Sequence, residues 1–267
     1  MGAAPLTAAD PAPGRLPLHV EELPGRPPAT VWLHHGLGST RSWTSLVPAL
    51  RQGRRAVLYD RRGFGASPRD RAFTPDLFVE DAVELEALVL ARGLAPAHLV
   101  GHSDGGTVAL LLAARRPDLV RSVAVVATHV CGEPGTVGTL QRMGRPSRDW
   151  DPATRRGLAR AHGADWERVA DAWHALWTSP AWAGWSIEAE LPRVRCPLLV
   201  CHDRRDDLAP PLHAERLQAA HPEARVVWWE TGSHEPHRRH QAAFAADLAR
   251  LWAAAEDGAD PRGAPGG

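Results

Sequence analysis

The sequence of 267 residues contains no lysine, since all 31 of its basic residues are arginine. This absence excludes Schiff-base catalysis and a lysine general base, because both need an ε-amino group. The sequence also has no apolar run of membrane-spanning length, and residues 1–14 have neither the basic start nor the apolar core of a signal peptide. We therefore expect a soluble, cytoplasmic protein without a membrane partner.

Cysteine is scarce, and the charges of the chain balance. Of the three cysteines, Cys196 and Cys201 lie at the two ends of one apolar run, too far apart along a strand to form a disulfide. We expect buried thiols in a reducing compartment. The 31 acidic residues offset the 31 basic ones and no long basic block occurs, so nothing favours nucleic acid as a partner.

Histidines are the residues that could ligate a metal ion. His237 and His240 stand three apart, a spacing that a metal site can use. They fall at the start of an expected helix, where a solvated, histidine-rich face is the more common arrangement. We therefore expect no metal site and no cofactor.

Short apolar runs alternate with helical patterns along most of the chain. Continuous apolar strands separated by helices are typical of a parallel sheet covered on both faces. The expected fold class is therefore α/β, a doubly wound and mostly parallel sheet, with ligands at the carboxyl ends of the strands. The expected strands are residues 16–23, 30–34, 56–60, 98–101, 122–129, 197–202 and 225–230, and the expected helices are residues 41–51, 76–92, 105–116 and 237–255.

Residues 131–195 interrupt this alternation, because they contain helical patterns punctuated by proline and no convincing strand. We expect this segment to be a helical lid over the strand ends, and residues 15–130 and 196–255 to be the core. Residues 1–14 and 256–267 are rich in proline, glycine, alanine and aspartate, and they are expected to be disordered tails.

The expected lid is rich in tryptophan. Two interpretations are open: the indoles only pack the lid on the body, or they form an aromatic wall above a pocket. Trp173, Trp177 and Trp182 are the candidates for contact with a substrate. The segment holds six of the eleven tryptophans of the chain, namely Trp150, Trp166, Trp173, Trp177, Trp182 and Trp185.

The sequence Gly101-His102-Ser103-Asp104-Gly105 follows an apolar run and directly precedes an alanine- and leucine-rich helical pattern. A serine in that place lies on a sharp strand-to-helix turn, where glycines avoid collisions and the hydroxyl is exposed at the end of the sheet. The amides that begin the helix suit an oxyanion. The alternative is an ordinary glycine-rich turn whose serine caps the helix.

The loop after the second expected strand, residues 35–38, has the sequence His-Gly-Leu-Gly. Its glycines let the backbone approach a bound carbonyl. The amides of Leu37 and Asp104 are therefore expected to form an oxyanion hole. His35 opens this loop and is a candidate for contact with the substrate.

The loops after the last two expected strands carry carboxylates and an imidazole. A serine hydroxyl is a poor nucleophile at neutral pH, so it needs an imidazole to take its proton, and the imidazole needs a carboxylate on its other nitrogen. His234 follows the last strand, and Asp203, Asp206 and Asp207 follow the strand before it. Position at a strand end does not distinguish the three aspartates, so each stays a candidate for the carboxylate that contacts the imidazole.

Together these features resemble the α/β-hydrolase fold superfamily, in its lidded, single-domain form. The resemblance covers residues 16–255 and includes residues 60–67, whose sequence Asp-Arg-Arg-Gly-Phe-Gly-Ala-Ser matches the family pattern DxRGxGxS. It implies a lid inserted after the sixth strand. It also implies Ser103 as nucleophile, His234 as base and Asp206 as acid.

Two positions depart from the family pattern. Asp203 stands where the family usually has glycine, so Asp203 and Asp207 stay alternatives to Asp206. The family usually has GxGH, which ends in the catalytic histidine. This chain has Thr231-Gly232-Ser233-His234, which keeps the position of the histidine and allows the loop fewer backbone conformations.

Asp104 directly follows the expected nucleophile, as in hydrolases of α-amino-acid esters that resemble valacyclovirase. This resemblance implies that the Asp104 carboxylate could hold a substrate ammonium. The alternative is that Asp104 only stabilises the start of the following helix, where aspartate is favoured.

We expect a serine hydrolase that cleaves an ester, or a related acyl bond, of a small and partly apolar molecule through an acyl-enzyme on Ser103. The protein is expected to be a monomer or a homodimer. The same fold and triad also host C–C bond hydrolases and lyases, and a non-catalytic ligand receptor is a third possibility. Dehalogenation is disfavoured, because it needs a carboxylate in place of the serine.

Overall fold

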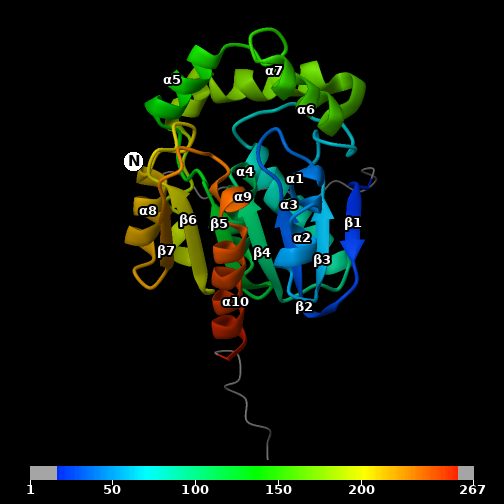
Figure 1. The fold of residues 1–267 in the computed structure, drawn as a ribbon, viewed down its shortest axis with the longest axis vertical. Helices are drawn as coiled ribbons and strands as arrows, with labels where there is room; N and C mark the ends of the chain where they lie inside the picture. The colour runs from blue at the N-terminus through cyan, green and yellow to red at the C-terminus, as the bar shows by residue number, and fades with distance from the viewer. Residues whose placement is uncertain (1–16, 258–267) are drawn as a thin grey trace, which may run out of the picture.

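Seven strands form one sheet in the order β1-β3-β2-β4-β5-β6-β7 in the computed structural model, which describes residues 17–257 (Figure 1). Neighbouring strands are parallel except β1, which runs antiparallel to β3. The predicted doubly wound, mostly parallel sheet is confirmed. The strands are β1 (Val20–Leu23), β2 (Arg26–Leu33), β3 (Arg54–Tyr59), β4 (Ala97–His102), β5 (Val120–Val126), β6 (Leu198–Asp203) and β7 (Arg225–Trp229).

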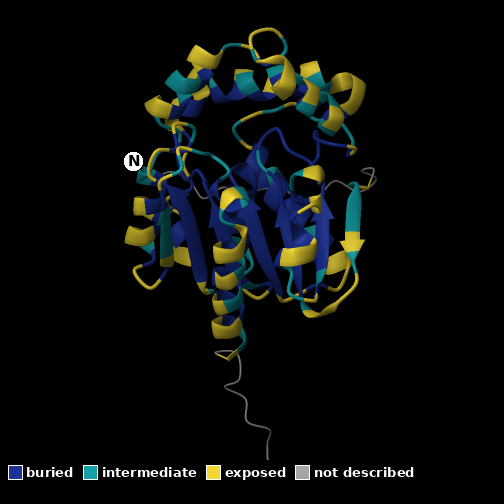
Figure 2. Cartoon of the chain, viewed as in Figure 1, coloured by how far each residue is buried: buried dark blue, intermediate teal, exposed yellow. Residues whose placement is uncertain are grey.

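The strands are continuously apolar because helices cover both faces of the sheet. Val31 and Leu33 of β2 pack into one core cluster, whereas Trp32 between them packs into the other. Figure 2 shows the central strands as buried. The first cluster is covered by α3 (Leu77–Ala91), α4 (Asp104–Arg115) and α8 (Leu212–Ala220), and the second by α1 (Arg41–Thr44), α2 (Val47–Leu50) and α10 (Gln241–Asp257).

The strand order reverses between β2 and β4, which lie side by side. In doubly wound sheets the crevice for a ligand opens at such a point, beyond the carboxyl ends of the strands. The loop that follows β2 contains residues 35–38, and β4 is followed directly by Ser103. The topology therefore places the two expected parts of an oxyanion hole next to each other.

The segment between β5 and β6 is helical, as predicted. We keep the name lid for residues 131–195, which include α5 (Pro134–Met143), α6 (Pro152–His162) and α7 (Trp166–Trp177). Figure 1 shows these helices lying across the carboxyl ends of the strands. The predicted insertion after the sixth strand is wrong for this chain. The lid follows the fifth, because only β1 to β5 precede it.

Two predicted helices are each divided in two. The predicted helix over residues 41–51 breaks between Thr44 and Val47, because Pro48 lacks an amide hydrogen and its ring would collide with the carbonyl four residues earlier. The predicted helix over residues 237–255 begins as the short α9 (Pro236–Arg239) and restarts at Gln241. His240 leaves the helical region between them, and its ring stacks on Trp229.

The predicted tails at residues 1–14 and 258–267 lie outside the described residues. Residues 256 and 257, which were also expected in a tail, instead belong to α10. The Glu256 carboxylate there pairs with Arg54 at 2.6 Å. In the part of the chain that the structure covers, no helix is long and apolar enough to cross a membrane. The three cysteines are free thiols, and Cys131 and Cys201 are buried as expected, whereas Cys196 is only half-buried.

Glycines allow the backbone to approach itself closely where β4 turns into α4. A Cβ atom on Gly105 would lie 2.5 Å from the Leu33 carbonyl oxygen and 2.6 Å from that of His34. A Cβ atom on Gly101 would lie 2.4 Å from the Gly105 carbonyl oxygen. These neighbours are backbone atoms, which cannot rotate away, so both positions require glycine.

We predict that Gly105→Ala lowers the free energy of unfolding by about 1–3 kcal/mol, the usual effect of forcing extra volume into a packed interior. The matched control is Gly184→Ala in the lid. Nothing lies within 4 Å of a Cβ atom at Gly184, so the control should stay within about 0.5 kcal/mol of the parent. Urea unfolding of the three proteins measures both values, and equal stabilities would contradict the packing argument.

Candidate active site

Ser103 lies on the sharp turn between β4 and α4, with φ +52° and ψ −122°. A non-glycine residue rarely adopts a positive φ, and a strained conformation of this kind persists only where the surroundings enforce it. The Ser103 amide donates to the Val126 carbonyl, and the Ser103 carbonyl accepts from the Thr128 hydroxyl. The serine therefore lies on the sharp strand-to-helix turn that its sequence predicted, and hydrogen bonds to the end of β5 and to the residue Thr128 just beyond it hold this turn in place.

The His234 imidazole contacts the Asp206 carboxylate, with 2.7 Å between Nδ1 and Oδ2. The other carboxylate oxygen of Asp206 accepts hydrogen bonds from the Leu208 and Ala209 amides. Because Nδ1 donates to Asp206, the second ring nitrogen of His234, Nε2, is the one left to accept a proton.

The surroundings of His234 favour its protonated form. Burial alone would lower the pKa of His234, but the Asp206 carboxylate more than offsets this, so the pKa lies above its ordinary value. Burial would raise the pKa of Asp206, and the contact with His234 together with the two amides brings it below its ordinary value. The pair is therefore poised to stabilise an imidazolium beside a carboxylate.

The two alternative aspartates have other surroundings. Asp203 accepts hydrogen bonds from the amides of Thr231 and Gly232 and from the Thr231 hydroxyl, and so shapes the loop that carries His234. Asp207 is exposed. The structure therefore places Asp206 at the imidazole. Asp203, which stands where the family usually has glycine, holds the neighbouring loop.

The amides of Leu37 and Asp104 are available to a ligand. Within residues 17–257, neither of these N–H groups donates to another protein group. Leu37 lines the same cavity as Ser103, and the Asp104 amide begins α4 directly after the nucleophile. Two free amides beside a nucleophile are the donors that an oxyanion needs.

A cavity of about 310 Å³ lies between the lid and the strand ends, and it is mostly apolar. Ser103 and His234 both line it, together with three of the predicted substrate-binding residues, His35, Trp173 and Trp177. Gly36 of the predicted loop and Trp150 of the possible aromatic wall line it as well. Sequence reasoning missed nine other lining residues, because the local sequence does not show which positions of the lid, of the loops and of the end of β4 face the cavity. These are His102, His129, Thr136, Leu140, Met143, Thr154, Leu158, Leu208 and Glu235.

Trp182 was predicted to contact a substrate, and this prediction is wrong. Its side chain is fully buried and is not among the residues that line the cavity. The Trp182 ring packs between Trp177 and Trp185, with ring centroids 4.3 and 4.5 Å apart. The packing interpretation therefore holds for Trp182, and the wall interpretation holds for Trp173 and Trp177.

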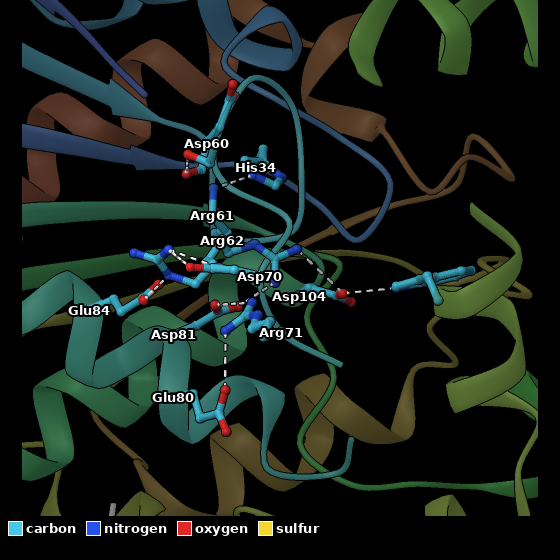
Figure 3. Close-up of polar contacts among 12 residues, drawn as sticks. His34, Asp60, Arg61, Arg62, Asp70, Arg71, Glu80, Asp81, Glu84 and Asp104 are labelled. Carbon is cyan, nitrogen blue, oxygen red and sulfur yellow. Dashed lines mark hydrogen bonds and ion pairs between the residues drawn. The ribbon is translucent and has the colours of Figure 1, made fainter. Parts of the chain in front are cut away.

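The Asp104 side chain lies in a buried cluster of charges (Figure 3), and it is not among the residues that line the cavity. Its Oδ2 atom accepts a hydrogen bond from Trp173 Nε1 at 3.1 Å and lies 3.6 Å from the Arg61 guanidinium. Burial raises the pKa of Asp104, and Arg61 and Trp173 oppose this rise. The carboxylate already has a cationic partner inside the protein and does not line the cavity where a substrate ammonium would lie.

Arg61 connects this cluster to the loop after β2. Its guanidinium is fully buried, bonds to Asp81 at 2.8 Å and donates to the His35 carbonyl at 3.2 Å. Asp81 in turn pairs with Arg71, as Figure 3 shows. A buried charge needs such partners, so the network fixes Asp104 and the loop in one arrangement.

Three side chains that line the cavity could hold a metal ion. Ligand atoms of His35, His102 and Glu235 lie within 4.8 Å of one another in the described part of the chain. Two of these groups already have protein partners. His102 Nε2 bonds to the His234 carbonyl, and the Glu235 carboxylate pairs with Arg238 at 2.7 Å.

The predicted solvated face at His237 and His240 is wrong in one part. His237 is buried, with its ring 5.0 Å from that of Trp43 and 4.9 Å from that of His102. Burial lowers its pKa to about 3. The start of the predicted helix is therefore packed on the body at His237 and is not solvated there.

The sequence matches the model of the alpha/beta hydrolase family over residues 31–247. The chain belongs to this family. Its sheet order, the serine on the turn after β4 and the histidine–aspartate contact agree with this family, and its relatives include a carbamate hydrolase and a serine hydrolase.

Two relatives and one solved structure illustrate the similarity. The chain is 31% identical to RutD of Stutzerimonas stutzeri over 81% of this chain and 88% of that protein, and 30% identical to the human serine hydrolase BPHL over 70% and 66%. The enol-lactonase from Burkholderia xenovorans LB400 superposes with a TM-score of 0.68 at 23% identity, over 88% of this chain and 96% of that chain. At this identity the structure supports the fold alone.

We predict that the hydrolytic rate falls as the pH drops through the pKa of His234, since the base must be neutral to accept a proton. This acid limb should lie above pH 6.5, the ordinary histidine pKa. Asp206→Asn removes the carboxylate that raises this pKa, so the limb should move to lower pH and the rate should fall roughly 10⁴-fold. Initial rates between about pH 4 and pH 9 measure both effects.

Asp207→Asn is the matched control, because it changes the same residue type next to Asp206 without touching His234. Its pH–rate profile should overlay that of the parent enzyme. If Asp207→Asn showed the larger loss, the acid would have been assigned to the wrong aspartate.

Proposed function

We propose that this alpha/beta hydrolase is a serine hydrolase that cleaves an ester, or a related acyl bond, of a small molecule with an apolar acyl group. One observation carries the proposal. Ser103 and His234 line the same cavity, and Asp206 occupies Nδ1 of His234, so the remaining ring nitrogen is available to the serine.

The acylation step uses groups that the chain supplies. Ser103 Oγ attacks the substrate carbonyl carbon while His234 Nε2 takes the hydroxyl proton. The Leu37 and Asp104 amides stabilise the negative charge that develops on the carbonyl oxygen. His234 then gives its proton to the leaving alcohol as the C–O bond breaks, and the acyl group stays on Ser103.

Deacylation repeats these steps with water as the nucleophile. His234 removes a proton from a water molecule, which attacks the acyl carbon, and the same two amides hold the second oxyanion. The proton then returns to Ser103 Oγ, and the carboxylic acid leaves. Asp206 stays ionised throughout and stabilises the imidazolium in both halves of the reaction.

The character of the cavity supports an apolar acyl group. Eight of the seventeen lining residues come from the lid, and six of these are apolar, namely Leu140, Met143, Trp150, Leu158, Trp173 and Trp177. The His129 ring also lines it, and burial lowers the pKa of His129 to about 3, so this histidine is neutral at physiological pH. A carbamate, the bond type for which the relative RutD is named a carbamate hydrolase, also has a carbonyl group for Ser103 to attack.

We predict that Ser103→Ala reduces hydrolysis of p-nitrophenyl esters by roughly 10⁴-fold or more, and that it abolishes covalent labelling by a fluorophosphonate probe. Within an ester series, apolar acyl chains should be preferred over charged ones of similar length. Ser45→Ala, a change of the same residue type at an exposed position, should leave both readings unchanged.

The outcomes separate the competing functions. A ligand receptor would not be labelled by the probe, because only an activated serine reacts quickly. A C–C bond hydrolase or lyase would be labelled and would turn over esters slowly, whichever acyl chain is offered. Wild-type rates in Ser103→Ala would refute a serine mechanism altogether.

A further inference from the structure

Two side chains of the lid contact the two residues whose amides form the oxyanion hole. Trp173 Nε1, on α7, donates to the Asp104 carboxylate at 3.1 Å. His162 Nε2, at the end of α6, donates to the Leu37 carbonyl at 3.0 Å. Each of the two amide-bearing residues is thus bonded to one lid side chain.

The hydrogen bonds of His162 define its tautomer. Its Nδ1 atom accepts from the Gly65 amide at 3.0 Å, so the ring proton is on Nε2 and points at Leu37. The ring is buried, and burial lowers the pKa of His162 to about 4. His162 is therefore a neutral link between the loop after β3 and the loop after β2.

The peptide that carries the Leu37 amide is held from both sides. The carbonyl before it, on His35, accepts from His34 Nδ1 at 2.7 Å and from Arg61 at 3.2 Å. The carbonyl after it, on Leu37, accepts from His162. The body fixes one flank of this peptide and the lid fixes the other, so the direction of the Leu37 N–H depends on both.

The contact between Trp173 and Asp104 lies beside the same loop, at Gly36. A Cβ atom on Gly36 would lie 2.4 Å from Trp173 Nε1 and 2.8 Å from Asp104 Oδ2, so the loop, the lid and the elbow meet where Gly36 has no side chain. Asp104 is fully buried, and its Oδ1 atom has no protein partner in the described part of the chain. The Trp173 indole is therefore one of the few groups that hold this carboxylate in place.

We propose that His162 and Trp173 are positioning residues that couple the seating of the lid to the assembly of the oxyanion hole. With the lid seated on the body, both amides already point at the substrate carbonyl oxygen before its negative charge develops. This preorganisation is the condition for strong stabilisation of the transition state. With the lid displaced, Leu37 and Asp104 each lose a hydrogen bond, and the amides lose their alignment. This inference rests on the serine hydrolase function proposed above.

The tryptophan test uses Trp173→Phe, which removes the N–H donor and keeps an aromatic ring. We expect kcat and the rate of Ser103 labelling by a fluorophosphonate to fall about 10- to 100-fold, somewhat less than the loss of an oxyanion donor itself. The matched control is Trp182→Phe, a lid indole outside the cavity whose Nε1 atom has no protein partner within residues 17–257. It removes similar packing and should change both rates by less than about threefold.

The histidine test compares two amides at one position. In His162→Gln the side-chain amide can reach the Leu37 carbonyl from the place of Nε2, whereas in His162→Asn it is too short and only the Gly65 contact can be kept. We expect a fall of about tenfold or more in kcat for His162→Asn, below the full loss of a donor, and substantial recovery in His162→Gln. His174→Asn is the control, since His174 Nε2 bonds to the Leu140 carbonyl within the lid at 3.0 Å.

A boronic acid inhibitor gives a readout that a merely structural role would not move. The boronic acid forms a tetrahedral adduct on the serine, so its affinity depends on the oxyanion hole. The product carboxylate binds without such an adduct, so its affinity reports the ground-state cavity. Trp173→Phe and His162→Asn should weaken boronate binding by the same factor as kcat/KM, with thermal midpoints close to those of their controls.

The failures of the two proposals are distinguishable. If the wild-type protein is not labelled at Ser103, the proposed function is wrong, and the inference falls with it. If the wild type is labelled but Trp173→Phe matches Trp182→Phe and His162→Asn matches His174→Asn, the serine hydrolase stands and the coupling of the lid to the hole is refuted.

Discussion

The close approach of α4 to the end of β2 is the constraint on which the rest of the site depends. Gly105 lies against the carbonyls of Leu33 and His34, and this contact leaves no room for a side chain. It forces the sharp turn that gives Ser103 its positive φ. It also brings the start of α4 beside the loop after β2, where a Cβ atom on Gly36, the residue before Leu37, would lie 2.8 Å from Asp104 Oδ2.

Buried charges hold the start of α4 and the loop after β2 in place, although burying them costs free energy that a purely apolar core would avoid. Arg61 bonds to Asp81, contacts the His35 carbonyl and lies near Asp104, all without access to solvent. Replacing such a network by apolar residues often leaves stability unchanged or improves it. Its presence beside the loop after β2 is therefore better explained by the need to orient backbone carbonyls and amides than by stability.

The histidines that line the cavity differ in the direction of their pKa shifts. Burial lowers the pKa of His35 and His129 to about 3, and it lowers that of His102 as well. His234 is the exception among the four histidines that line the cavity, because its ring faces the buried Asp206 carboxylate at hydrogen-bond distance. The electrostatics of the site thus leave one imidazole able to accept a proton near neutral pH.

The sequence by itself determined the features that local backbone chemistry encodes. Apolar runs between helices gave the sheet, and a serine between glycines at a strand end gave the elbow. Partners that come from distant segments could not be read in this way. Asp104 was open to two roles because its neighbours, Arg61 and Trp173, are 43 and 69 positions away, and Trp182 could not be told from Trp177. Only the tertiary structure decided which aspartate meets His234, which indoles face the cavity and what holds Leu37, because side-chain contacts depend on how remote elements pack against one another.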